Sequence, residues 1–156
     1  MHIRLIAVGD RQPAWVLQAF DQYVRRLPRQ WQFRLEVVAT ARRGNDSDTV
    51  KARQTESRKV LDKLQPAEQV VLLDETGTQW SSAELSAQLL LWQDAGRDLA
   101  FLIGGPDGMD DECLRRADLR WSLSNLTLPH GMARVLVAEQ LYRAWTITTG
   151  HPYHRA

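Results

Sequence analysis

Short apolar segments recur along the chain at intervals that suit a sheet. Residues 3–8, 69–74 and 98–103 are almost entirely apolar, which is typical of strands buried on both faces in the middle of a parallel sheet. Residues 31–39 begin with alternating polar and apolar positions, and residues 119–124 form one more short segment of this kind. The pattern therefore predicts five strands.

Between these segments the apolar positions follow the period of a helix. Residues 13–27 open on a proline, which favours the start of a helix, and residues 48–64 form a highly charged helix that is expected to face mainly solvent. Ser81 and Glu84 have the spacing of a capping box and predict the start of a further helix. A short helix is expected at about 110–117.

The last predicted helix follows Pro129 and continues until Gly150 ends it. The tail "HPYHRA" then places two histidines, a tyrosine and an arginine within six residues. A packing element does not need these groups, so they are either solvated or part of a site. The apolar positions of this helix are Val135, Leu136, Ala138, Leu141, Tyr142, Trp145 and Ile147.

Strands and helices alternate in the order βαβαβαβαβα. This order predicts an α/β fold with a mostly parallel sheet and helices on both faces. With 156 residues, 44% of them hydrophobic, and six tryptophans, the chain has material for one packed domain, residues 1–156, and too little for a second.

The composition narrows the class of protein. Every apolar run is far shorter than the roughly 20 residues that a membrane span requires, so no membrane association is expected. No basic segment followed by an apolar stretch opens the chain, so we expect no signal peptide, and the lone Cys113 cannot form an internal disulfide. These features predict a cytoplasmic protein. The net charge of +1 argues against binding nucleic acid by bulk electrostatics.

Three predicted loops follow the carboxyl ends of strands, where open α/β sheets bind their ligands. They are residues 72–77, 103–108 and 122–130. The glycines of "IGGPDG" allow main chain to approach a ligand closely, or they simply make a tight turn. The sequence "LSNLTLP" offers an apolar wall with exposed main-chain groups, which suits an adenine ring, or it fills the core as a buried loop end.

A metal site or a nucleophilic cysteine is less well supported. His130, His151 and His154 are candidate ligands, but no cysteine accompanies them and surface histidines are common, so no metal is expected. Cys113 is expected to be a packing residue of a helix rather than a nucleophile.

Several motifs together resemble one family over essentially the whole chain. The stretches "LDETG", "LIGGPDG", "WSLSNLTLPHGMARVLVAEQLYRAW" and "HPYHR" are similar to those of the RlmH family, small bacterial SPOUT-class methyltransferases. The resemblance implies methyl transfer from S-adenosylmethionine (SAM) to N3 of a pseudouridine in 23S rRNA, on the assembled 70S ribosome. It also implies a trefoil knot near the C-terminus and a homodimer whose C-terminal helices pack together.

The candidate catalytic residues follow from the chemistry of the tail, which comes directly after the helix of the implied dimer. The reaction has to dispose of the N3 proton, and we expect His154 to accept it. Tyr153, Arg155 and Arg143 are expected to line the pocket for the target base, with Arg134 as a further candidate. These groups would otherwise bind the rRNA backbone or only order the tail. The implied cofactor residues are Leu73, Gly104, Leu123, Ser124, Asn125, Leu126, Thr127 and Leu128.

Of the 20 basic residues 17 are arginine, whose planar guanidinium suits phosphate. The pairs Arg25/Arg26 and Arg42/Arg43 are candidates for local phosphate contacts, or they belong to an ordinary solvated surface. Three other functions stay open: a SAM-dependent methyltransferase that acts on another RNA, a ribosome-associated binding factor without catalysis, and a flavodoxin-like nucleotide-binding module. The last of these is expected to carry a phosphate-binding loop after its first strand, where this chain has "GDRQP".

Overall fold

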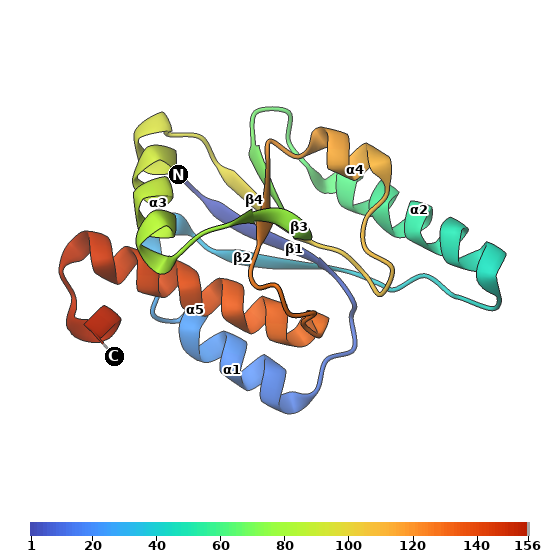
Figure 1. The fold of residues 1–156 in the computed structure, drawn as a ribbon, viewed down its shortest axis with the longest axis horizontal. Helices are drawn as coiled ribbons and strands as arrows, with labels where there is room; N and C mark the ends of the chain where they lie inside the picture. Colours follow the sequence, from blue (N-terminus) through green and yellow to red (C-terminus); the bar gives the residue numbers. More distant parts are fainter. Residues whose placement is uncertain (156) are drawn as a thin grey trace.

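Five parallel strands form the centre of the computed structural model, which describes residues 1–155 and all their side chains except those of Asp46 and Ser47 (Figure 1). The spatial order of the strands is β2-β1-β4-β3-β5, and all four neighbouring pairs are parallel. The predicted parallel sheet is confirmed. The strands are β1 (Ile3–Val8), β2 (Arg34–Val38), β3 (Gln69–Gln79), β4 (Leu99–Ile103) and β5 (Leu119–Ser122).

Helices cover both faces of this sheet, as predicted. Figure 1 shows α1, α3 and α5 on one side and α2 and α4 on the other. None of the helices in the described part of the chain is long and apolar enough to span a membrane. Their bounds are α1 (Ala14–Val24), α2 (Asp46–Lys63), α3 (Ser82–Ala95), α4 (Asp111–Arg116) and α5 (His130–Thr149), with 3-10 turns at Arg29–Trp31 and Pro152–Arg155.

The core consists of two apolar layers, one on each face of the sheet. Strand β4 supplies both, because successive side chains of a strand point to opposite faces. Phe101 packs with residues of α1, α3 and α5, whereas Leu102 packs with Val60 of α2. All five residues of β4 are buried. This explains why the strand reads as one continuous apolar run.

Three predicted elements differ from the structure. Helix α2 begins at Asp46 rather than at residue 48, and although most of its described side chains are exposed or half-exposed as predicted, it buries Ala52, Glu56, Ser57 and Val60. Helix α1 ends at Val24 rather than at the predicted residue 27, and a turn then leads to the following proline. Strand β3 does not end at residue 74 but continues through the predicted loop 72–77, with a shift of its pairing to β5.

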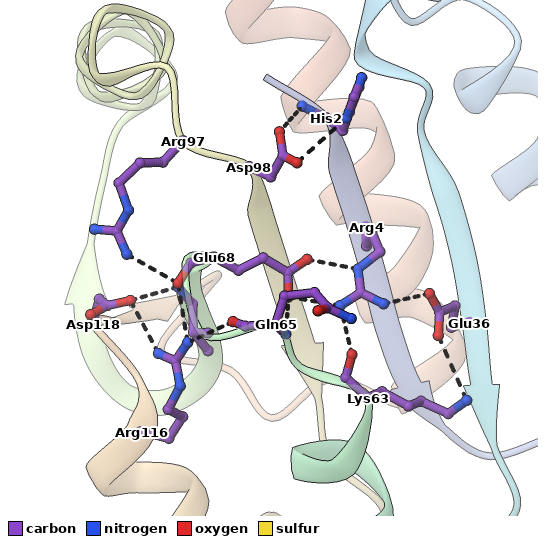
Figure 2. A network of polar contacts seen from close by, with 11 residues as sticks. His2, Arg4, Glu36, Lys63, Gln65, Glu68, Arg97, Asp98, Arg116 and Asp118 are labelled. Atoms are coloured by element: carbon purple, nitrogen blue, oxygen red, sulfur yellow. Dashed lines mark hydrogen bonds and ion pairs between the residues drawn. The ribbon is translucent and has the colours of Figure 1, made fainter.

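A network of ion pairs closes the amino ends of the strands (Figure 2). The guanidinium of Arg4 donates from Nε and Nη2 to the two carboxylate oxygens of Glu68, at 2.8 and 2.7 Å, and from Nη1 to Glu36 at 2.6 Å. Arg97 and Arg116 both donate to the carbonyl oxygen of Glu68. The Glu68 carboxylate is nearly buried, so its charge is stabilised by Arg4 rather than by water.

Candidate functional site

A cavity of about 470 Å³ lies at the carboxyl ends of β3, β4 and β5. This volume lies within the usual range for small-molecule sites, roughly 300–1,000 Å³. Most of its walls come from the segments 72–76, 103–109 and 120–128, apart from Pro106 and Asn125, and the rest from Leu114, His130 and Ala133. These are the three segments that the sequence places at the carboxyl edge of the sheet.

Most of the expected cofactor residues meet around this cavity. Asn125 does not line it, because its side chain turns away and accepts a hydrogen bond from Nε2 of Gln79 at 2.7 Å. The remaining residues come from three separate segments and share one space. Those that line it are Leu73, Gly104, Leu123, Ser124, Leu126, Thr127 and Leu128.

The leucine-rich segment 122–128 forms an apolar wall of the cavity, and part of this wall is exposed to solvent. Leu126 is 74% exposed, although it borders the cavity, so the core-filling alternative is wrong for this residue. A local bond holds the turn in place, since the backbone N–H of Leu126 donates to Oγ of Ser124 at 2.9 Å. An exposed leucine at the mouth of a cavity gains free energy when a ligand covers it.

The loop of residues 104–108, called the cofactor loop below, folds back on itself. A Cβ atom on Gly104 would lie 2.9 Å from the carbonyl carbon of Gly108, so a side chain there would force the loop apart. The tight turn by itself therefore requires glycine at this position. As a result the cofactor loop presents main chain to the cavity.

The charges around the cavity are mainly negative. Asp74, Glu75 and Asp107 line it, against one guanidinium, that of Arg120. Arg120 lies 3.2 Å from a carboxylate oxygen of Asp74. The surplus of carboxylates favours a ligand that carries positive charge. Sequence reasoning missed these side chains as individual candidates, although two of them lie within the motif "LDETG".

His130 borders the cavity as a neutral side chain. Burial lowers its pKa, the nearby Arg134 lowers it further, and a hydrogen bond with the backbone of Gly104 partly offsets both effects. Its place at the first turn of α5 separates it from His151 and His154, which follow the last turn. Within residues 1–155 no three His, Cys, Asp or Glu side chains are arranged to hold a metal ion.

Cys113 is fully buried in α4, as expected of a packing residue. Burial raises the pKa of its thiol to about 11, so the thiol carries its proton at neutral pH.

The residues expected to act on the target base form a separate cluster on the second half of α5, onto which the tail folds back. Glu139 joins two of them: its Oε1 accepts from Nε of Arg143 at 2.9 Å and from the hydroxyl of Tyr153 at 3.1 Å. The guanidinium of Arg143 also lies 4.9 Å from the centre of the Tyr153 ring. Arg155 is exposed, and Nδ1 of His154 is buried without a hydrogen-bond partner in the described part of the chain.

This tail cluster and the cavity do not meet within one chain. None of Glu139, Arg143 and Tyr153 lines the cavity, and Glu139 follows His130 by nine residues, about 14 Å along the axis of α5 at a rise of 1.5 Å per residue. Figure 1 shows the tail in red, beyond the end of α5 that points away from its first turn. Arg134 lies near the cavity end of α5 but is only 2% exposed. Its guanidinium donates to the carbonyl oxygens of Val8 and Gly9, so it ties α5 to the end of β1.

A family model described as "Predicted SPOUT methyltransferase" matches residues 1–154 of this chain. The chain belongs to the SPOUT methyltransferase family. This SPOUT methyltransferase is 49% identical over 155 residues to "Ribosomal RNA large subunit methyltransferase H" of Thioalkalivibrio sulfidiphilus, which covers 99% of each chain. It is 48% identical to the protein of the same name from Chromohalobacter salexigens, over 99% of this chain and 100% of that one. These relatives confirm the resemblance to the RlmH family.

A solved structure shows the same fold at low sequence identity. The probable methylase family protein of Haemophilus influenzae Rd KW20 superposes with a TM-score of 0.56 and 12% identity, over 97% of this chain and 69% of that one. The putative methylase family protein of Neisseria gonorrhoeae gives a TM-score of 0.55 at 16% identity, over 90% and 81% of the two chains. The α/β fold of this SPOUT methyltransferase is therefore that of known methylase structures.

Proposed function

We propose that this protein is a SAM-dependent methyltransferase that methylates N3 of a pseudouridine in 23S rRNA on the assembled 70S ribosome. The observation that carries the proposal is the cavity at the carboxyl edge of the sheet, in a chain that matches a methyltransferase family over residues 1–154. The names of its relatives support an rRNA substrate from the large subunit.

The residues around the cavity fit SAM. Leu73, Leu123 and Leu128 offer apolar surface for the faces of the adenine ring, and the main chain around Gly104 offers donors and acceptors for its edge. Asp74 and the other carboxylates suit the positive charge of the sulfonium. When bound, SAM supplies the methyl group as an electrophile. Asn125 does not line the cavity, and its hydrogen bond with Gln79 ties the leucine-rich segment to the end of β3.

A second copy of the chain completes the site in this proposal. The tail does not border the cavity of its own chain, because Tyr153 binds Glu139, about 14 Å along α5 from His130. A homodimer whose C-terminal helices pack together would bring the tail of one subunit to the cavity of the other. The resemblance also implies a trefoil knot near the C-terminus, and this knot stays a prediction.

The tail then provides the groups that handle the N3 proton. His154 accepts the proton in this proposal. Arg155 and Arg143 stabilise the negative charge that develops on the ring carbonyl oxygens. Burial raises the pKa of Tyr153, and its contacts with Tyr23 and Glu139 add to the shift, so its phenol remains a donor at neutral pH.

The first experiment measures methyl transfer from labelled SAM to ribosomes from cells that lack this protein. Intact 70S particles are compared with free 23S rRNA, and the labelled base is mapped. We expect label at a pseudouridine of the 70S particle. Label on neither, with measurable SAM binding, would point to another RNA substrate. Absence of SAM binding would favour the binding factor without catalysis.

A second experiment tests the base. We expect His154→Ala to lower turnover about 100-fold, a typical loss for a general base, with the dissociation constant for SAM unchanged. Normal turnover in this variant would overturn the assignment and leave the tail with a role in rRNA binding or in its own folding. Arg155→Ala, compared at several salt concentrations, separates a phosphate contact from charge stabilisation.

A further inference from the structure

We propose that Arg43 is a positioning residue that ties the cofactor loop to helix α2 and so holds one wall of the cavity in its binding shape. The tie runs from Glu56 in α2, through the guanidinium of Arg43, to Asp107 in the loop. The effect on SAM binding rests on the function proposed above, whereas the effect on the loop itself does not.

The guanidinium of Arg43 is shared between the two carboxylates. Nη2 and Nη1 donate to the two oxygens of Glu56 at 2.8 and 2.9 Å, and Nε donates to Oδ2 of Asp107 at 2.7 Å. Nη1 also donates to the carbonyl oxygen of Ala41 at 2.9 Å. This geometry uses the planar fork of an arginine, which a lysine cannot reproduce.

Glu56 is a fixed anchor for the tie. It is fully buried, and the backbone N–H of Ala41 donates to its Oε2 at 2.9 Å. The cofactor loop packs directly on it, because a Cβ on Gly105 would lie only 2.6 Å from Oε1 of Glu56. A buried carboxylate in this place requires its cation, so the position of Arg43 is strongly constrained.

The other end of the tie is a wall of the cavity. Gly104, Gly105 and Asp107 line the cavity, whereas Arg43 and Glu56 do not. Because the loop packs against itself between Gly104 and Gly108, a shift of Asp107 moves the main chain that faces the ligand. Arg43 therefore acts on the ligand only through the loop.

Arg42 and Arg43 form one candidate pair in the sequence, but they have different surroundings in the structure. Arg42 is exposed and remains a candidate for a phosphate contact. The side chain of Arg43 is 20% exposed, and its donors are directed at groups of the protein. Arg42→Met is consequently a matched control for Arg43 at the adjacent position.

The test variant replaces both members of the buried pair, Arg43→Met with Glu56→Gln. The double change avoids leaving a buried carboxylate without a cation, so a loss of overall stability does not obscure the result. Hydrogen exchange of the amides at 104–109 is measured without SAM, and SAM affinity is measured by isothermal titration calorimetry. We expect faster exchange confined to the loop and SAM binding weaker by about tenfold, a typical effect of lost preorganisation.

Two controls isolate the positioning role. Arg42→Met should leave both loop exchange and SAM affinity as in the wild type. Arg4→Met with Glu68→Gln removes a similar pair at the opposite edge of the sheet, and it should not change loop exchange. If the double variant at 43 and 56 does not fold, Asp107→Asn tests the outer half of the tie, with an expected increase in loop exchange and about threefold weaker SAM binding.

The outcomes separate this inference from the proposed function. Wild-type exchange in the loop of either test variant would overturn the tie, whatever the SAM affinity. Faster loop exchange in a protein that does not bind SAM even as wild type would confirm the tie and reject the cofactor. Weaker SAM binding together with faster loop exchange supports both.

Discussion

The two ends of the sheet use charged side chains in different ways. At the amino ends, Arg4 pairs with both Glu36 and Glu68, and its donors are directed at groups of the protein (Figure 2). At the carboxyl ends, the loops present main chain and leucines to an open cavity, and the Arg43 network ends at a loop. The same chemistry thus serves stability at one edge and, in our proposal, ligand binding at the other.

This difference follows from what each carboxylate contacts. Glu68 at the start of β3 is surrounded by donors from several elements, so its pairing closes the edge. Asp107 in the cofactor loop has Arg43 on one side and the cavity on the other. A change at the amino edge should therefore alter unfolding, whereas a change at the carboxyl edge should alter SAM binding.

The largest effect is expected for Arg4→Met. It leaves the nearly buried Glu68 carboxylate without its cation, and breaking such a pair lowers the free energy of unfolding by about 3 kcal/mol. Urea denaturation measures this loss, and calorimetry should find SAM affinity unchanged. As a control, Arg25→Met removes an exposed pair with Asp21 and should cost less than about 0.5 kcal/mol. Weaker SAM binding in Arg4→Met would contradict the division of roles.

The next largest effect is expected for Gly104→Val. The new side chain would meet the main chain of Gly108, so the cofactor loop must open, and we expect SAM binding to weaken about 100-fold, or about 2.7 kcal/mol. Gly96→Asn is the control at the end of α3, because Gly96 has a φ of 66° and open space around it, and asparagine tolerates this conformation. Unchanged SAM affinity in Gly104→Val would remove the loop from the site.

A smaller effect is expected for Leu126→Ala. Because Leu126 is largely exposed in the free protein, its truncation should change the free energy of unfolding by less than about 0.5 kcal/mol. If SAM covers this side chain, its removal should reduce the binding free energy by about 1 kcal/mol, equivalent to about fivefold weaker SAM binding. Leu91→Ala, at an exposed leucine of α3, should leave SAM binding unchanged. Equal affinities of the two variants would show that the ligand does not reach Leu126.

The smallest effect concerns the pH dependence of stability at the carboxyl edge. The pKa of His130 is lowered below its ordinary value of 6.5, so the unfolded chain binds the proton more tightly than the folded one. The stabilisation of the folded state by neutral His130 is fully present above pH 6.5, and it is lost as the pH falls through the pKa of the folded state. His130→Asn should therefore show a smaller fall in melting temperature between pH 7.5 and 5.5 than the wild type. An identical fall would mean that His130 does not contribute.

Much of the fold could be predicted because the signals are local. The apolar run of β4 and the capping box of Ser81 and Glu84 depend on neighbouring residues, and both are present in the structure. The continuation of β3 past residue 74 was missed, because its polar positions are held in the strand by β5, more than 40 residues later.

The candidate site, too, could be predicted from the sequence only in part. The sequence by itself determined the order of the elements, and with it the loops that meet at the carboxyl edge, because parallel strands bring their carboxyl ends to one side. Only the tertiary structure decided that Asp107 pairs with Arg43, 64 residues away, and that Tyr153 of the tail folds back onto Glu139 in the middle of α5. Side-chain pairs between distant segments depend on where whole elements pack, and local periodicity carries no information about that packing.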